Sequence, residues 1–234
     1  MNILITRPLM DAEDLMEKLF AYGHKIIHLP TLKISAVETE LVNPDNFDAF
    51  VFTSTNAVRN LKLTNTNRNL HCFCVGSITE KIVRQLGFTN TSSAGGTVNA
   101  LKNLIMISDQ VNKSSNLAYF CGDNISYDLD LELREEGLKI KKIINYSSEI
   151  ISDINNENKK LIKNYPPDLI YIYSARSAES FTAIVKNYGL KPLVTQSTVM
   201  CISEKVANIF KSQGWKKIEI FIPGDEMLKL KDLN

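Results

Sequence analysis

Residues 3–8 read Ile3-Leu4-Ile5-Thr6-Arg7-Pro8, an apolar run that stops at a polar turn, and this stretch decides the fold. After the turn, Leu15 and Leu19 stand at helical spacing, Gly23 follows, and residues 25–29 are apolar again. This periodicity predicts a strand, an amphipathic helix and a second strand, with Gly23 as a left-handed helix cap. Two strands joined through a helix run parallel, so the first residues predict a β–α–β unit.

The same junction of helix, glycine and strand returns at Gly87, Gly137 and Gly214. Short apolar runs and amphipathic segments alternate along nearly the whole chain. Strands that alternate with helices of these lengths form parallel sheets with helices on both faces. The sequence therefore predicts an α/β protein.

Two pairs of similar stretches also suggest an internal repeat. Residues 52–58 and 172–178 each end an apolar run and open a helix, and residues 74–77 and 201–204 follow them in the same order. Few positions are identical, which leaves two interpretations. Either the protein has two similar α/β halves, or any two strand–helix–glycine units look this much alike.

Two further strand-like segments, residues 32–38 and 143–150, lie between the two halves and do not belong to the repeated strand–helix units. One could leave a domain and the other return to it, so that they pair as a two-stranded linker. We therefore expect a discontinuous α/β domain of residues 1–35 and 150–234, and an inserted α/β domain of residues 38–146.

Charge and hydropathy exclude several classes of protein. The 234 residues contain 27 Lys and Arg and 26 Asp and Glu, so there is no basic excess for a nucleic-acid partner. No apolar run approaches the roughly 18 residues of a membrane span, and the first residues lack the basic region of a secretory signal. We expect a cytoplasmic protein whose cysteines (Cys72, Cys74, Cys121 and Cys201) are free, buried thiols.

Motifs for common cofactors are missing. There is no G-x-G-x-x-G after a strand and no G-x-x-x-x-G-K-[ST] loop, so nucleotide binding has no fingerprint in the sequence. His24 and His28 are four residues apart, but they fall on a predicted strand without a nearby carboxylate or cysteine, and we expect no metal. With three histidines in the chain, no convincing Ser-His-Asp arrangement is found.

What remains is a set of polar and glycine residues where predicted strands end and helices begin. Such turns lie at the carboxyl edge of a parallel sheet, where backbone N–H groups and helix dipoles favour anions such as carboxylates. Taken singly, each Ser, Thr or Asn could instead be an ordinary helix N-cap. The candidate binding residues are Arg7, Thr53, Ser54, Asn56, Gly76, Ser77, Thr79, Gly122, Ser174, Ala175, Arg176 and Ser203.

Taken together and in order, these motifs resemble the uroporphyrinogen-III synthases. The resemblance spans nearly the whole chain and is carried by residues 3–8, 29–30, 52–58, 75–79 and 120–122 and by the isolated Tyr146. The chain departs from the family in residues 201–205, which lack the glycine and the threonine that the family often has in that turn. Contacts from that turn are accordingly left open.

The resemblance implies two flavodoxin-like domains joined by a two-stranded ladder, and no cofactor. It implies hydroxymethylbilane, a linear tetrapyrrole rich in carboxylates, as the substrate. Loss of its hydroxyl leaves an azafulvene cation, which the substituted carbon of the last pyrrole attacks to give a spiro intermediate that recloses with that ring inverted. Arg7 is expected to clamp a carboxylate, and Tyr146 to act as the acid; a surface ion pair and packing at the linker are the respective alternatives.

We expect the enzyme, a cyclising lyase, to be a monomer that could receive its substrate from the preceding enzyme of the pathway. Two other functions stay open from the sequence. One is a sugar or nucleotide transferase with an eroded phosphate loop, and the other is a non-catalytic two-lobed ligand-binding module.

Overall fold

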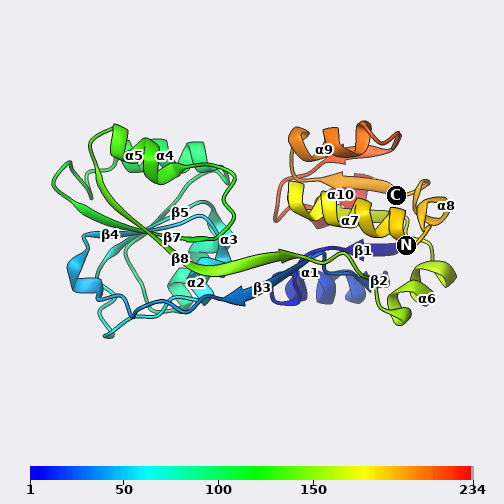
Figure 1. Ribbon diagram of the computed structural model, residues 1–234, viewed down its shortest axis with the longest axis horizontal. Coiled ribbons are helices and arrows are strands. Elements are labelled where there is room, and N and C mark those ends of the chain that lie inside the picture. Colours follow the sequence, from blue (N-terminus) through cyan, green and yellow to red (C-terminus); the bar gives the residue numbers. More distant parts are fainter. Residues whose placement is uncertain (233–234) are drawn as a thin grey trace. The chain divides into compact units, whose positions relative to one another are not determined.

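A computed structural model describes residues 1–232 of the chain (Figure 1). Positions 233–234, which end the predicted segment 150–234, lie outside the described residues. The chain divides into two compact units. The discontinuous unit comprises Met1–Lys33 and Glu149–Asn234, and the inserted unit comprises Ile34–Ser148.

The discontinuous unit is built on a sheet of parallel strands. Its strands are β1 (Asn2–Ile5), β2 (Lys25–His28), β9 (Leu169–Ile172), β10 (Thr198–Cys201) and β11 (Ile218–Ile220). They lie in the order β11-β10-β9-β1-β2, and every pair is parallel. Numbered along this unit alone, the order is the flavodoxin order 2-1-3-4-5.

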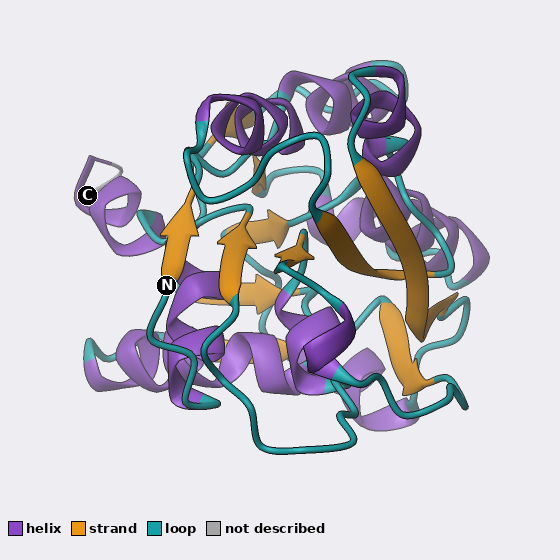
Figure 2. Cartoon of the chain, turned by 90° about the vertical axis from the view of Figure 1, so that its left-hand side faces the viewer, coloured by secondary structure: helices purple, strands orange, loops and turns teal. Residues whose placement is uncertain are grey.

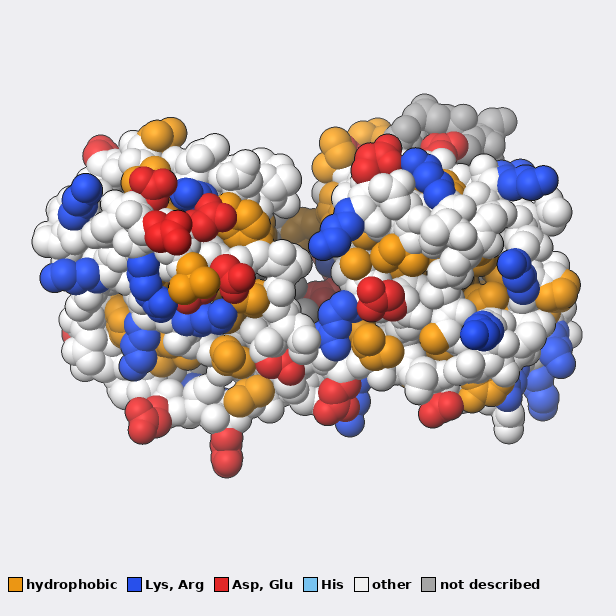
Figure 3. Space-filling view, turned by 45° about the horizontal axis from the view of Figure 1, so that its top comes forward, with side chains coloured by type: hydrophobic (Ala, Val, Ile, Leu, Met, Phe, Trp, Pro, Cys, Tyr) orange, Lys and Arg blue, Asp and Glu red, His pale blue; other side chains and the backbone are white. Residues whose placement is uncertain are grey.

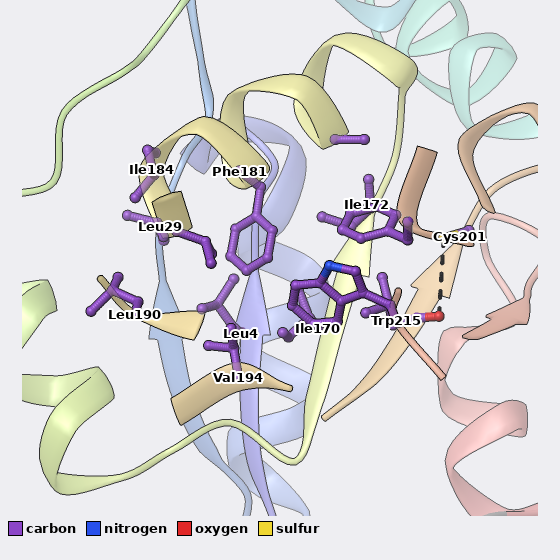
Figure 4. Close-up of a cluster of buried hydrophobic side chains, with 14 of the residues drawn as sticks. Leu4, Leu29, Ile170, Ile172, Phe181, Ile184, Leu190, Val194, Cys201 and Trp215 are labelled. Atoms are coloured by element: carbon purple, nitrogen blue, oxygen red, sulfur yellow. Dashed lines mark hydrogen bonds between the residues drawn. The ribbon is translucent and has the colours of Figure 1, made fainter. Parts of the chain in front are cut away.

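Helices cover both faces of this sheet because alternate residues of each strand point to opposite sides. The helices are α1 (Leu9–Ala21), α6 (Asn156–Asn164), α7 (Ala175–Asn187), α8 (Lys191–Val194), α9 (Glu204–Lys211) and α10 (Glu226–Asp232). Leu4 and Ile170 belong to the core under α6 to α9, and Figure 4 shows them meeting Phe181 of α7 and Trp215. Ile3 and Ile5 belong to the opposite core, with residues of α1 and α10.

The inserted unit has a second, mostly parallel sheet. Its strands are β3 (Leu32–Ala36), β4 (Ala49–Phe52), β5 (His71–Cys74), β6 (Thr91–Ser93), β7 (Asn116–Gly122) and β8 (Lys139–Ile150), in the order β3-β8-β7-β4-β5-β6. The helical segments are η1 (Pro44–Asn46), α2 (Thr55–Arg59), α3 (Ser77–Gln85), α4 (Val98–Ile107) and α5 (Leu129–Glu135). One core lies under α2 and α3 and the other under α4 and α5, so helices again flank the strands (Figures 1 and 2). The predicted α/β class, with helices on both faces of parallel sheets, is confirmed.

The two sheets have the same arrangement once the chain order is set aside. The strand β9 has the same place in its sheet as β4 has in the inserted unit. In the same way, β10, β11, β1 and β2 correspond in position to β5, β6, β7 and β8. By their own numbering the strands β4 to β8 therefore have the order 3-2-1-4-5. The similar stretches 52–58 and 172–178 end the equivalent strands β4 and β9, which favours the interpretation as two similar halves.

The predicted two-stranded linker is formed by β3 and β8, which are neighbours in the sheet. The Val37 amide donates to the carbonyl of Asn145 at 3.2 Å, and the Ile151 amide donates to the carbonyl of Thr31 at 3.0 Å. Residue numbers rise along one segment as they fall along the other, so the two run antiparallel. This pairing explains why residues 32–38 do not continue into a helix.

The glycine junctions and the cysteines agree with the sequence predictions. Gly23, Gly87, Gly137 and Gly214 have φ between 80° and 93°, the left-handed conformation that other residues adopt at a cost. Each lets the chain leave a helix and turn back to the sheet. All four cysteines are free and buried.

Candidate functional site

Near the middle of each sheet, two neighbouring strands send the helices that follow them to opposite faces. In the discontinuous unit these strands are β9, followed by α7, and β1, followed by α1. In the inserted unit they are β4, followed by α2, and β7, followed by α5. Ligands of open α/β sheets bind beyond the carboxyl ends of strands at such a switch point.

A hydrogen-bonded turn fixes Arg7 at the end of β1. The buried Thr6 hydroxyl donates to the carbonyl of Tyr171 at 2.7 Å, and His28 Nε2 donates to the carbonyl of Arg7 at 2.9 Å. The Arg7 side chain is half-buried, and its guanidinium carbon lies 4.4 Å from the centre of the Tyr173 ring. A guanidinium stacked on an aromatic face keeps its N–H donors free in the plane of the fork. The structure thus brings a cation to the switch point of this unit.

Ser174 and Ser203 are helix N-caps at the ends of β9 and β10. Ser174 Oγ accepts from the Ser177 amide at 3.0 Å, and Ser203 Oγ accepts from the Val206 amide at 3.4 Å. Ala175 and Arg176 form the first turn of α7. The plainer interpretation therefore holds for both serine side chains, while the N-terminal helix dipoles still face the carboxyl edge of the sheet.

In the inserted unit, the turn after β4 repeats this design. Ser54 caps α2 by accepting from the Asn56 amide at 3.1 Å. Thr53 Oγ1 lies 3.2 Å from the phenolic oxygen of Tyr119 on β7, which ties the two switch-point strands together. Burial raises the pKa of Tyr119 well above its ordinary value, so this phenol stays protonated.

The turn after β5 contributes less side-chain surface than expected. Gly76 is the N-cap of α3 and has no side chain to cap it, and Ser77 is exposed. A β-carbon on Gly76 would lie 3.4 Å from Cα of Gly96, an ordinary van der Waals distance. Thr79 is buried at 4% exposure, so its side chain packs into the unit rather than facing solvent.

Tyr146 of β8 lies directly against Gly122 at the end of β7. The two residues are paired across a register shift between Cys121 and Gly122. Next to Tyr146, the buried Asn145 donates through Nδ2 to the carbonyl of Ala57 at 2.8 Å and so holds β8 to α2. Tyr146, Gly122, Thr53 and Ser54 are thereby collected at one edge of one sheet.

The structure groups the candidates into sets by the strand end that carries them. Arg7, Ser174, Ala175 and Arg176 share the switch point of the discontinuous unit, and Ser203 follows the next strand. Thr53, Ser54, Asn56, Gly122 and Tyr146 share the other switch point, and Gly76, Ser77 and Thr79 follow the next strand there. Sequence reasoning missed Tyr173, Glu226, Tyr119 and Asn145. Tyr173 could have been found, since it sits in the same turn as Ser174; Glu226 gave no signal.

Other chemistry is limited by the surroundings of the reactive groups. Burial raises the pKa of Cys74 and of Cys201 to about 12 and that of Cys121 to about 11, so these thiols are poor nucleophiles.

Within residues 1–232, no three His, Cys, Asp or Glu side chains are grouped as metal ligands. None of the described helices has the length and apolar character needed to cross a bilayer. On the face seen in Figure 3, acidic and basic side chains lie intermixed.

Comparisons with known proteins agree on one family. A family model described as uroporphyrinogen-III synthase HemD matches residues 13–220. Among solved structures, uroporphyrinogen-III synthetase from Helicobacter pylori superposes with a TM-score of 0.60 at 16% identity, over 94% of this chain and 91% of that one. A mutant uroporphyrinogen III synthase from the extremely thermophilic bacterium Thermus thermophilus gives 0.53 at 14% identity, over 93% and 92%. At such identities the likeness concerns the fold. A search among curated proteins finds no match.

Proposed function

Since the chain belongs to the uroporphyrinogen-III synthase family, we propose that it closes hydroxymethylbilane with turns at the carboxyl edges of its two sheets. The observation that carries this function is the family match over residues 13–220, most of the chain. The reaction inverts the last pyrrole ring through a spiro intermediate and releases water. It makes the protein a cyclising lyase of tetrapyrrole biosynthesis.

The substrate carboxylates are proposed to bind at the switch points. Arg7 supplies a planar fork for one carboxylate, and helix N-termini supply backbone N–H groups for others. Spreading a polyanion over many such donors holds the flexible chain folded, with its two ends close together. The proposed binding residues are Arg7, Thr53, Ser54, Asn56, Gly76, Ser77, Thr79, Gly122, Ser174, Ala175, Arg176 and Ser203. Because the side chain of Thr79 is buried, its proposed contribution is limited to its backbone N–H group.

Tyr146 is proposed to assist the departure of the substrate hydroxyl. Its phenol donates a proton to the leaving oxygen, which departs as water while the pyrrole nitrogen supplies the electron pair. The azafulvene cation is then attacked by the substituted carbon of the last pyrrole. When the new ring system regains its aromatic pyrroles it loses one proton, which restores the phenol and balances the cycle. The position of Tyr146 at the same sheet edge as Thr53 and Gly122 supports this role.

The two alternative functions are less well supported. A nucleotide or sugar transferase would need a phosphate-binding loop, and Gly76 is followed by Ser77-Ile78-Thr79 rather than by a lysine. A non-catalytic binding module would bind a bilane without turning it over. Cytoplasmic location, a monomeric state and receipt of substrate from the preceding enzyme complete the proposal.

Product analysis tests the proposed function. Freshly generated hydroxymethylbilane is incubated with the protein, and the oxidised products are separated by chromatography. We expect the type III isomer to predominate, at a rate that a chelator does not change. If only the spontaneous type I isomer accumulates, the enzymatic function is wrong. Binding of the bilane without any enzymatic turnover would then favour the binding-module alternative.

A further inference from the structure

The stack of Arg7 on Tyr173 joins the two strands of a switch point. Arg7 follows β1 and Tyr173 follows β9, and these strands are paired, with Ile5 opposite Tyr171. The 4.4 Å separation between guanidinium carbon and ring centre lies within the range of a cation–π interaction. A long arginine side chain otherwise has many rotamers, so this ring face determines where its donors lie.

The Tyr173 ring is itself held in one orientation. It lies edge to face against Phe221, with ring centres 5.2 Å apart and an interplanar angle of 85°. Its hydroxyl donates to Glu226 Oε1 at 3.1 Å. Burial and the Glu226 carboxylate raise the pKa of Tyr173 well above its ordinary value, so the hydroxyl remains a donor.

Glu226, the first residue of α10, is a fixed point rather than a mobile surface acid. Its exposure is 5%. Oε2 accepts from the Gly224 amide at 2.8 Å, and the backbone carbonyl of Glu226 accepts from the Tyr171 hydroxyl at 3.2 Å. A buried carboxylate is costly without hydrogen bonds, and here it receives them from the neutral donors Tyr173 and Gly224. The result is a chain of contacts from Glu226 through Tyr173 to Arg7.

We propose that Tyr173 and Glu226 are positioning residues, which hold the Arg7 guanidinium at the carboxyl edge of β1 and β9 to bind a carboxylate of the substrate. The inference rests on the proposed function, because it concerns how the same site recognises its polyanionic substrate. Tyr173 acts through Arg7 and has no contact of its own with the reacting carbons. It therefore affects KM, and kcat stays close to the wild-type value.

A double-mutant cycle distinguishes positioning from a general structural role. KM and kcat for hydroxymethylbilane are measured for Arg7→Ala, Tyr173→Leu and the double variant. We expect Arg7→Ala to raise KM about ten-fold, as expected for the loss of a charge-assisted pair, and Tyr173→Leu to raise it about three- to ten-fold. In the Arg7→Ala background, Tyr173→Leu should change KM by less than about two-fold.

Two conservative variants keep the test informative if Tyr173→Leu folds poorly. Tyr173→Phe keeps the ring under Arg7 and loses the bond to the Glu226 side chain, and we expect a smaller rise in KM, about two- to three-fold. Tyr171→Phe is the matched control, since it loses a hydroxyl bond to the Glu226 backbone but its ring does not stack on Arg7. It should leave KM within about two-fold of wild type.

The outcomes separate this inference from the proposed function. If the wild type forms no type III isomer, the function fails and the cycle cannot be measured. If the wild type is active and the effects of Arg7→Ala and Tyr173→Leu multiply, or if Arg7→Ala leaves KM unchanged, the positioning role is wrong while the function stands. Equal effects of Tyr171→Phe and Tyr173→Phe would also overturn it.

Discussion

The Tyr146 ring lies so close to Gly122 that a β-carbon on that glycine would be 2.7 Å from Cζ of the ring. The same β-carbon would be 3.0 Å from the phenolic oxygen. Side-chain atoms do not approach each other this closely, so the missing side chain of Gly122 is a condition for the position of the proposed acid.

Gly122→Ala should therefore displace the Tyr146 hydroxyl. The backbone of Gly122 is not in the left-handed region, so alanine strains the contact rather than the chain. We expect kcat to fall about ten-fold or more, as for partial loss of a general acid, with a fold that circular dichroism cannot distinguish from wild type. Gly95→Ala is the matched control, because a β-carbon there meets no atom within 4 Å. Equal rates for both variants would contradict the prediction.

Tyr146→Phe tests the phenol directly, since it keeps the ring on Gly122 and removes only the donor. We expect kcat to fall about ten-fold or more while the product remains type III, because folding of the bilane and acid assistance are separate tasks. Steady-state kinetics and isomer analysis measure both. A wild-type rate for Tyr146→Phe, together with unfolding of Tyr146→Ala, would make Tyr146 a packing residue of the linker.

Loss of a single neutral side chain among the proposed binding residues should have a mild effect. Thr53→Ala, Asn56→Ala and Ser174→Ala are each expected to cost about 1 kcal/mol or less in transition-state stabilisation, the scale of one neutral hydrogen bond. Ser174→Ala should also lower the free energy of unfolding by about 1 kcal/mol, because the Ser177 amide loses its cap. Ser174→Asn, which retains a capping oxygen, should restore stability. A loss of kcat/KM larger for Ser174→Ala than for Arg7→Ala would contradict the prediction.

Glu80 on α3 should make the free energy of unfolding depend on pH in the acid range. Hydrogen bonds from Ser93, Thr91 and Arg84 lower the pKa of Glu80 to about 2. The folded state thus favours the carboxylate, so its contribution is complete above the ordinary pKa of about 4.3 and is lost as the pH falls towards 2. In urea unfolding, the advantage of wild type over Glu80→Gln should be equal at pH 7 and pH 6 and smaller at pH 3. A pH-independent difference would refute this, and the exposed Glu135→Gln serves as the control.

The inserted domain should fold by itself. A fragment of residues 38–146 contains β4 to β7 and most of β8, and it should show a cooperative thermal transition. A fragment of residues 1–117 should fold poorly, since it contains β1 and β2 without β9 and lacks β8. Calorimetry of both fragments shows which of them unfolds cooperatively. Cooperative unfolding of residues 1–117 and none of residues 38–146 would overturn the discontinuous arrangement.

Much of the fold was predictable because strands, helices and glycine caps are specified by local periodicity. The turns in residues 3–8 and 52–58 could also be assigned to the carboxyl edges of their sheets, since a turn that links a strand to the following helix begins at the carboxyl end of the strand. The pairing of Gly122 with Tyr146 could not be predicted, because it depends on a shift of register between Cys121 and Gly122. Glu226 was missed for a similar reason, since its contact with Tyr173 arises only once β9 and the final segment are packed together.

The arrangement of the sheets also has a consequence for protein synthesis. Ile3 pairs with Leu169, so β1 leaves the ribosome long before its neighbour β9 has been made. The strands β4 to β8, in contrast, all find their partners within one continuous stretch. The nascent chain is thus expected to finish the inserted unit while an apolar edge of β1 is still unpaired, and a chain released early would expose that edge to aggregation. Chains that end before β9 should for this reason aggregate more readily than the number of missing residues alone would suggest.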